Sequence, residues 1–188
     1  MGPVAQPGWS VRLIEGLGKM PMIDLQSLIP QRTSRGDPIT YRVEGDYITV
    51  CYERARGRPK PIKIRRSVDR ELFIAGVTIW ACEGTRKRPY ELEVTNSSSV
   101  IAKTFIKLLK ELGLGESVKL RLHATPSEYE RLKRYWRNIL GIDAFSTPII
   151  TESRGSKDIG NGIIHIKVYS AVLRELFNYW AEALPQLL

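Results

Sequence analysis

Residues 72–86, LFIAGVTIWACEGTR, are the most informative part of this 188-residue sequence. They predict a helix over about residues 69–83, with Ser67 or Asp69 as its N-cap and Gly84 at its end. The interior of this helix is apolar on every face, which predicts that it is buried on all sides. It also contains small residues that would let a second helix approach closely, namely Ala75, Gly76, Thr78 and Ala81.

A carboxylate, Glu83, stands at the end of this predicted helix, directly before Gly84. A negative charge there opposes the helix dipole and costs about 0.3–1 kcal/mol. If the helix packs against its own copy across a two-fold axis, two Glu83 carboxylates meet at one end of the pair. Paired carboxylates favour a hard divalent cation, which can polarise a phosphodiester and activate water. The alternative is an ordinary core helix with an exposed glutamate at its end.

This stretch resembles the motif of the LAGLIDADG homing-endonuclease family, in which a close-packed helix ends in an acid followed by glycine. Residues 78–84, TIWACEG, align with the second half of that motif, so that Glu83 falls on the metal-binding acid and Gly84 on the final glycine. The chain departs from the motif with Thr78 at the helix-packing glycine and with glutamate in place of the commoner aspartate. The likeness extends loosely from about Ile62 to Leu184, and the region 126–140 resembles the longer archaeal and bacterial forms.

The resemblance implies a homodimer joined through the 69–83 helix, because family members with a single motif act as homodimers. It also implies that Glu83 of each subunit binds Mg²⁺ or another divalent cation for phosphodiester hydrolysis of duplex DNA. Flanking lysines assist in the family, and Lys157 and Lys167 are the candidates here. The family also includes relatives that bind DNA without cleaving it. A non-catalytic transcription regulator, or a degenerate remnant on the same fold, is therefore the main alternative to a site-specific endonuclease.

Hydrophobic periodicity predicts the other elements of the chain. The predicted strands are a hairpin over 39–53 with Gly45 and Asp46 at its turn, and segments 90–95, 118–124, 147–152 and 163–169. The predicted helices are 98–112, a helix through Leu140 with Thr125 as N-cap and Pro126 as its first residue, and 171–183, which ends before Pro185. Together they predict an α+β fold, with helices on one side of a mixed, mostly antiparallel sheet. We expect an N-terminal extension over 1–66, with the hairpin and a basic segment, and a LAGLIDADG-like domain over 67–188.

Basic residues outnumber acidic ones by 29 to 20, and much of the excess is local. Residues 54–66, RARGRPKPIKIRR, carry no acid and seven basic side chains: Arg54, Arg56, Arg58, Lys60, Lys63, Arg65 and Arg66. Such a concentrated segment is typical of phosphate contacts, with a merely solvated loop as the alternative. A membrane surface is a poorer partner, because the segment lacks an amphipathic helical pattern.

Two predicted strands present further cations on the face opposite their apolar residues. The outward residues are Lys119, Arg121 and His123 on one strand, and His165, Lys167 and Tyr169 on the other. Such a face suits contacts with phosphates and base edges of duplex DNA, although antiparallel sheets commonly keep one polar face. Glu91 and Glu93 on the 90–95 strand oppose this interpretation, unless they pair with Arg86 and Arg88, which we also count as DNA-binding candidates.

Other kinds of chemistry lack support in the sequence. The phosphate-loop, HExxH and GxSxG motifs are all missing, and no feature indicates an organic cofactor. Cys51 and Cys82 lack the spacing of a zinc site or a disulfide scaffold, and the longest apolar stretch is too short to cross a bilayer. With no signal-peptide pattern at the start, we expect a cytoplasmic protein. An RNA-binding module is a weaker alternative.

Overall fold

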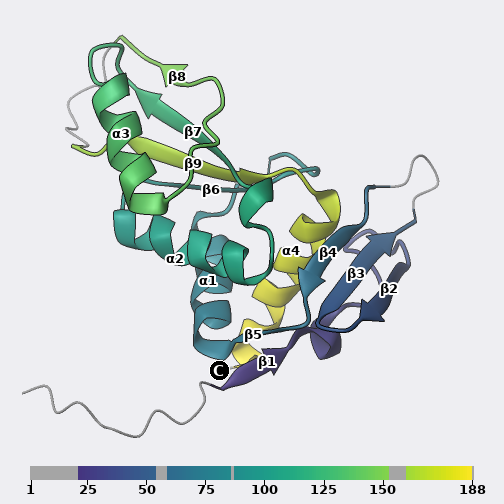
Figure 1. Ribbon diagram of the computed structural model, residues 1–188. Helices are drawn as coiled ribbons and strands as arrows, with labels where there is room; N and C mark the ends of the chain where they lie inside the picture. The colour runs from purple at the N-terminus through teal and green to yellow at the C-terminus, as the bar shows by residue number, and fades with distance from the viewer. Residues whose placement is uncertain (1–20, 54–58, 86, 153–159, 188) are drawn as a thin grey trace, which may run out of the picture.

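A computed structural model describes residues 21–53, 59–85, 87–152 and 160–187 of the chain. Within these ranges the protein is an α+β structure in which helices pack against sheets (Figure 1). The strands are β1 (Met22–Asp24), β2 (Ile39–Glu44), β3 (Tyr47–Tyr52), β4 (Ile62–Arg65), β5 (Ser67–Asp69), β6 (Leu92–Asn96), β7 (Lys119–Ala124), β8 (Ile149–Ile150) and β9 (Ile163–Val168). The α-helices are α1 (Arg70–Glu83), α2 (Ser99–Glu111), α3 (Tyr129–Leu140) and α4 (Ala171–Leu187). Short 3₁₀ helices are η1 (Leu25–Leu28) and η2 (Gly115–Ser117).

The larger sheet has the strand order β6-β9-β7-β8. β9 runs antiparallel to both β6 and β7, and β8 adds a short parallel edge. Alternate residues of the three long strands are fully buried and face the helices: Leu92, Val94, Leu120, Leu122, Ile164 and Ile166. The predicted α+β class with a mostly antiparallel sheet is therefore confirmed.

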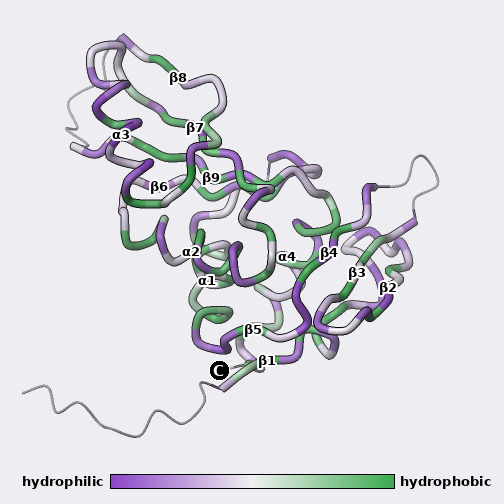
Figure 2. The backbone as a smooth tube through the Cα atoms, in the orientation of Figure 1, coloured by the Kyte–Doolittle hydropathy of each residue, from purple (hydrophilic) through white to green (hydrophobic). Residues whose placement is uncertain are grey.

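Helix α1 is the predicted 69–83 helix, and it packs between α2 and α4. The Asp69 carboxylate caps it by accepting a hydrogen bond from the Leu72 amide at 2.7 Å. Gly76 lies against Leu108 of α2, so closely that a methyl group at position 76 would overlap that side chain. Figure 2 shows α1 as mostly hydrophobic along its length, as its sequence requires.

The prediction that α1 is buried on all sides is wrong for the single chain. Its exposed positions include Glu71, Thr78 and Cys82, and Ala75 between them is half-buried. The spacing of these four residues places them on one side of the helix. The physical reason is that α2, α4 and the nearby strands cover only part of the circumference of α1 within one chain.

The N-terminal part of the chain forms a second sheet with the order β2-β3-β4. Its buried side carries Ile48, Val50, Ile62 and Ile64, and β3 contacts α4. The Trp180 indole of α4 donates a hydrogen bond to the carbonyl oxygen of Leu28 at 2.9 Å. Residues on both sides of the expected boundary at 66/67 thus contribute to one hydrophobic core.

Two helix boundaries differ from the predictions. The Thr125 hydroxyl bonds the Glu128 carboxylate at 2.6 Å, so residues before Tyr129 form a turn, and the predicted N-cap and first-residue proline lie outside α3. Helix α4 continues through Pro185 to Leu187. Proline removes one backbone donor there, but its position is exposed, while Leu184 and Leu187 pack against the core. No helix in the described ranges is both long enough and apolar enough to cross a bilayer.

Candidate nucleic-acid interface and the Glu83 position

Glu83 is the last residue of α1, and its side chain is exposed. Gly84 follows with an extended backbone, donates its amide to the Trp80 carbonyl at 2.9 Å and pairs with Val94 of β6. A side chain at position 84 would overlap the Trp80 ring, which explains the glycine next to the acid. The turn therefore holds Glu83 at the junction of α1 and the larger sheet.

A single copy of Glu83 is a poor metal site. Among the residues that the structure describes, no group of three or more His, Cys, Asp or Glu side chains is placed to hold a metal ion. A hard divalent cation takes several oxygen ligands, and one exposed carboxylate supplies two oxygens at most. Within the described residues, Glu83 therefore lacks the further oxygen ligands that such a cation requires.

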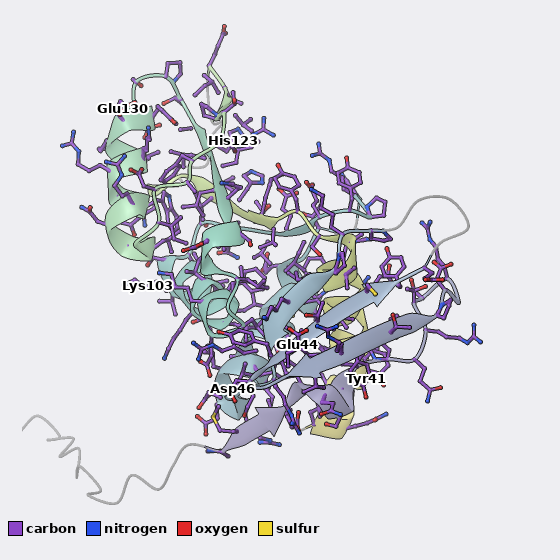
Figure 3. The ribbon with its side chains drawn as sticks, turned by 45° about the vertical axis from the view of Figure 1, so that its right-hand side comes forward. Tyr41, Glu44, Asp46, Lys103, His123 and Glu130 are labelled. Carbon is purple, nitrogen blue, oxygen red and sulfur yellow. The ribbon has the colours of Figure 1, made fainter. Side chains whose placement is uncertain are left out.

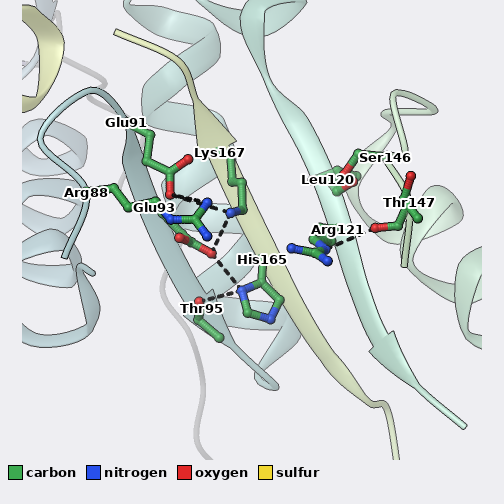
Figure 4. A network of polar contacts seen from close by, with 10 residues as sticks. All are labelled: Arg88, Glu91, Glu93, Thr95, Leu120, Arg121, Ser146, Thr147, His165 and Lys167. Carbon is green, nitrogen blue, oxygen red and sulfur yellow. Dashed lines mark hydrogen bonds and ion pairs between the residues drawn. The ribbon is translucent and has the colours of Figure 1, made fainter. Parts of the chain in front are cut away.

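The outward side of the larger sheet carries a network of ion pairs near its centre (Figure 4). The Lys167 ammonium of β9 lies 3.0 Å from Glu93 Oε1 and 3.6 Å from Glu91 Oε1. Arg88 Nη1 lies 3.3 Å from Glu91 Oε1. His165 Nδ1 lies 2.7 Å from Glu93 Oε1 and completes the network.

The ion pairs of Lys167 with Glu91 and Glu93 are buried, and burial changes the chemistry of Glu93. Burial by itself would raise the pKa of this carboxyl, but hydrogen bonds from His165 and Lys167 outweigh it and lower the pKa to about 2. Lys167 keeps only 4% of its surface exposed, and Glu91 none. Glu93 therefore stays ionised at neutral pH and neutralises the cations beside it.

The expectation that Lys167 belongs to an exposed cationic face is therefore wrong. In the observed register Glu93 stands directly opposite Lys167, and opposite charges in a cross-strand pair attract. His165 is half-buried, also not fully exposed as expected. Arg88 does pair with Glu91, as the interpretation required of that acid, whereas Glu93 pairs with Lys167 and His165.

The exposed cations of this face lie toward β7. Lys119 is exposed, whereas Arg121 is half-buried and its Nε donates to the Thr147 carbonyl at 3.0 Å. His123 is half-buried near the parallel edge formed by β8. Tyr169 follows β9 directly and keeps 60% of its surface exposed. The predicted residues thus share one side of the sheet, but differ widely in how much solvent they meet.

The basic segment is described from Pro59 onward. Lys60 is exposed, and β4 turns Lys63 and Arg65 outward while Ile62 and Ile64 face the core. Lys63 lies 3.6 Å from Glu44 and over the ring of Tyr47, and Arg66 bonds Asp24 at 2.8 Å. Five candidates lie outside the described residues: Arg54, Arg56, Arg58, Arg86 and Lys157.

Two further residues of this surface were not predicted, Arg42 and Tyr47. The register aligns Arg42, Thr49 and Lys63 in one row across the three strands, and Tyr47 and Arg65 in the next. The signal was present in the hairpin sequence, because both residues alternate with the apolar ones. Figure 3 shows Glu44 on this smaller sheet and His123 on the larger one. Lys63 and Arg65 on β4 and Lys119 on β7 therefore belong to two different sheets.

Comparison with known proteins leaves the family open: no family model, no curated protein and no solved structure matches this chain.

Proposed function

We propose that the protein binds duplex DNA as a homodimer of LAGLIDADG type, with the Glu83 carboxylates of two subunits side by side. The observation that carries the proposal is the open side of α1 next to Glu83. Ala75, Thr78 and Cys82 recur at helical spacing on this side and end one residue before the acid. Their small side chains allow the same helix of a second subunit to approach closely.

A two-fold axis running along such a helix pair would bring both Glu83 side chains to the same end. Two carboxylates in that position repel each other, and a bound divalent cation such as Mg²⁺ relieves the repulsion. A cation there would supply Lewis-acid polarisation of a phosphodiester and an activated water. The two Glu83 side chains would hold it between the half-sites of the DNA.

The exposed cations supply the contacts with DNA. We assign phosphate contacts to Lys119 on β7, to Lys63 and Arg65 on β4, and to Lys60, which precedes β4; all four are exposed. Such contacts position the protein on duplex DNA without selecting a sequence. Sequence selection would fall to the less exposed Arg121, His123 and His165.

Plasmid nicking with Mg²⁺ or Mn²⁺ tests the catalytic part of the proposal. We expect Glu83→Gln to abolish cleavage and leave DNA binding intact, because glutamine keeps the size of the side chain and loses its charge. Glu130→Gln is the matched control, since Glu130 is an exposed glutamate on α3 (Figure 3). This variant should cleave DNA as well as the unmutated protein does. The endonuclease assignment fails if the unmutated protein binds DNA and never nicks it with any divalent metal.

A non-catalytic DNA-binding regulator is the second candidate, and one observation favours it. Lys167 was one of two lysines considered as assistants in cleavage, but it is buried and paired with Glu91 and Glu93. A lysine held in this way cannot reach a phosphodiester or its attacking water. Binding of duplex DNA by the unmutated protein without nicking would support this candidate.

A further inference from the structure

A cleft of about 570 Å³ lies between the smaller sheet and the junction of β9 with α4. Residues from four separate segments line it, including Lys60, Lys63, Tyr90, Tyr169 and Ser170. Its described lining contains no aspartate or glutamate. The cleft is therefore a cationic and aromatic site that lies apart from Glu83 and from the open side of α1.

The two tyrosines present their rings to solvent from well-anchored positions. Tyr90 is 56% exposed, yet the next residue, Glu91, is completely buried. Tyr169 is 60% exposed and stands between Val168, which is buried, and Ser170, whose hydroxyl accepts a hydrogen bond from the Leu173 amide at 3.1 Å. Large exposed aromatic side chains on a fixed backbone are typical of binding surfaces.

The two lysines complement the rings. Lys60 and Lys63 are exposed and belong to the 59–63 segment of the lining, and Lys63 also lies 3.6 Å from Glu44 of β2. An ammonium group binds phosphate as a point charge, and an aromatic ring stacks on the face of a nucleobase. A ligand with both features is a nucleotide.

We propose that this cleft binds unpaired nucleotides of a single-stranded nucleic acid, with bases against Tyr90 and Tyr169 and phosphates near Lys60 and Lys63. The bases of a duplex are already stacked on their neighbours, so their faces are closed to a tyrosine ring. An unpaired strand offers those faces freely. This inference goes beyond the proposed duplex binding, and it requires neither the dimer nor Glu83.

Fluorescence anisotropy with a dye-labelled short oligothymidine tests the inference. We expect Tyr90→Ala and Tyr169→Ala each to weaken binding by about tenfold, because each removes one stacking surface. Tyr90→Phe and Tyr169→Phe should bind nearly as well as the unmutated chain, since phenylalanine keeps the ring. Tyr179→Ala is the matched control, because Tyr179 is 40% exposed but lies on α4 near Glu175 and Glu182.

The inference is overturned if both alanine variants bind the oligothymidine as tightly as Tyr179→Ala. It is also overturned if Tyr90→Ala and Tyr169→Ala weaken binding of a labelled hairpin duplex as much as they weaken binding of the single strand. Far-ultraviolet circular dichroism would verify that each variant is folded. A Lys119→Ala variant separates the two proposals: weaker duplex binding with unchanged oligothymidine binding supports both, while absence of duplex binding in the unmutated chain defeats only the proposed function.

Discussion

Glu93 and Lys167 face each other across β6 and β9, and their pairing determines what the centre of the sheet can do. A lysine at an outward strand position would ordinarily reach solvent and attract phosphate. Here Glu91 and Glu93 hold it in a buried cluster that also contains His165, whereas Arg88 pairs with Glu91 and keeps 52% of its side chain exposed. Removal of one partner from such a cluster leaves an uncompensated charge, which is far more harmful than the loss of a surface ion pair. At the scale of single residues, this cluster therefore stabilises the fold. Its charges largely neutralise one another, which leaves little charge for binding a phosphate.

The first prediction concerns the stability of this cluster in acid. The folded pKa of Glu93, about 2, lies below its ordinary value of 4.5, so its contribution to stability is fully present above pH 4.5 and is lost as pH falls toward 2. We expect the free energy of unfolding to fall between pH 5 and pH 2 by on the order of a few kcal/mol from this group. Urea unfolding at a series of pH values would measure it.

Glu93→Gln provides the comparison. This variant should be less stable than the unmutated protein at pH 7 and should lose less stability on acidification, because one low-pKa carboxyl is gone. Glu130→Gln, at an exposed position on α3, should follow the unmutated curve. Equal acid sensitivity of Glu93→Gln and the unmutated protein would contradict the assignment.

At the scale of elements, the small residues of α1 lie on two different sides of the helix, one facing α2 and one open. Gly76 serves the contact with α2 inside the chain, where Leu108 leaves no room for a side chain. Ala75 and Thr78 lie on the open side instead. Because the rest of the chain covers α1 on only part of its circumference, these small side chains are left toward solvent, where a second helix could approach them closely.

The second prediction follows from that open side. Thr78→Arg should convert a dimer into a monomer, because a long charged side chain at the centre of a close helix contact cannot be accommodated. The fold should survive, since Thr78 is exposed in the single chain. Sedimentation velocity would report the change in mass.

Val100→Arg on α2 is the control for this experiment. Val100 is 71% exposed and apolar, but it lies on another helix, so the arginine there should leave the mass unchanged. A monomeric unmutated protein at every concentration tested would remove the basis for dimerisation through α1.

At the scale of the whole molecule, exposed positive charge is spread over two sheets. Lys119 belongs to the larger sheet, and Lys63 and Arg65 belong to the smaller one. Glu44 and Asp24 offset part of the charge of the smaller sheet by pairing with Lys63 and Arg66. Duplex binding through such separate contacts would depend on their sum and weaken steeply with salt.

The third prediction concerns the contact of Lys119 with a DNA phosphate. Lys119→Ala should weaken duplex binding for all sequences alike and reduce the slope of log affinity against log salt by about one. Lys103→Ala should have little effect, because Lys103 lies on α2 (Figure 3), and α2 packs on the side of the larger sheet opposite to Lys119. Anisotropy titrations at several salt concentrations give both slopes. A flat salt dependence of the unmutated protein would exclude phosphate binding as the main source of affinity.

Local sequence patterns were sufficient to predict most of the helices and strands. Apolar and polar residues alternate along β2, β3, β7 and β9 and recur with helical spacing in α1 and α2. These patterns arise because apolar side chains are buried away from water. Glycine at position 84 and aspartate at position 69 mark the ends of α1 for equally local reasons, namely backbone geometry and capping. The ends of α3 and α4 could not be predicted in this way, since a side-chain bond to Glu128 and the packing of Leu184 and Leu187 outweighed the preferences of Thr125 and Pro185.

The candidate site shows the limit of such patterns most clearly. From the sequence alone one learns that Glu83 ends an apolar helix and that Lys119, His165 and Lys167 point to the same side of a sheet. Only the tertiary structure shows that Lys167 pairs with two carboxylates and that Leu108 of α2 fills the space beside Gly76. It alone also shows that Tyr90 and Tyr169 line the same cleft. The reason is physical: the side on which a residue lies follows from its neighbours along the chain, whereas its charge partner and its exposure depend on strand register and on segments distant in sequence.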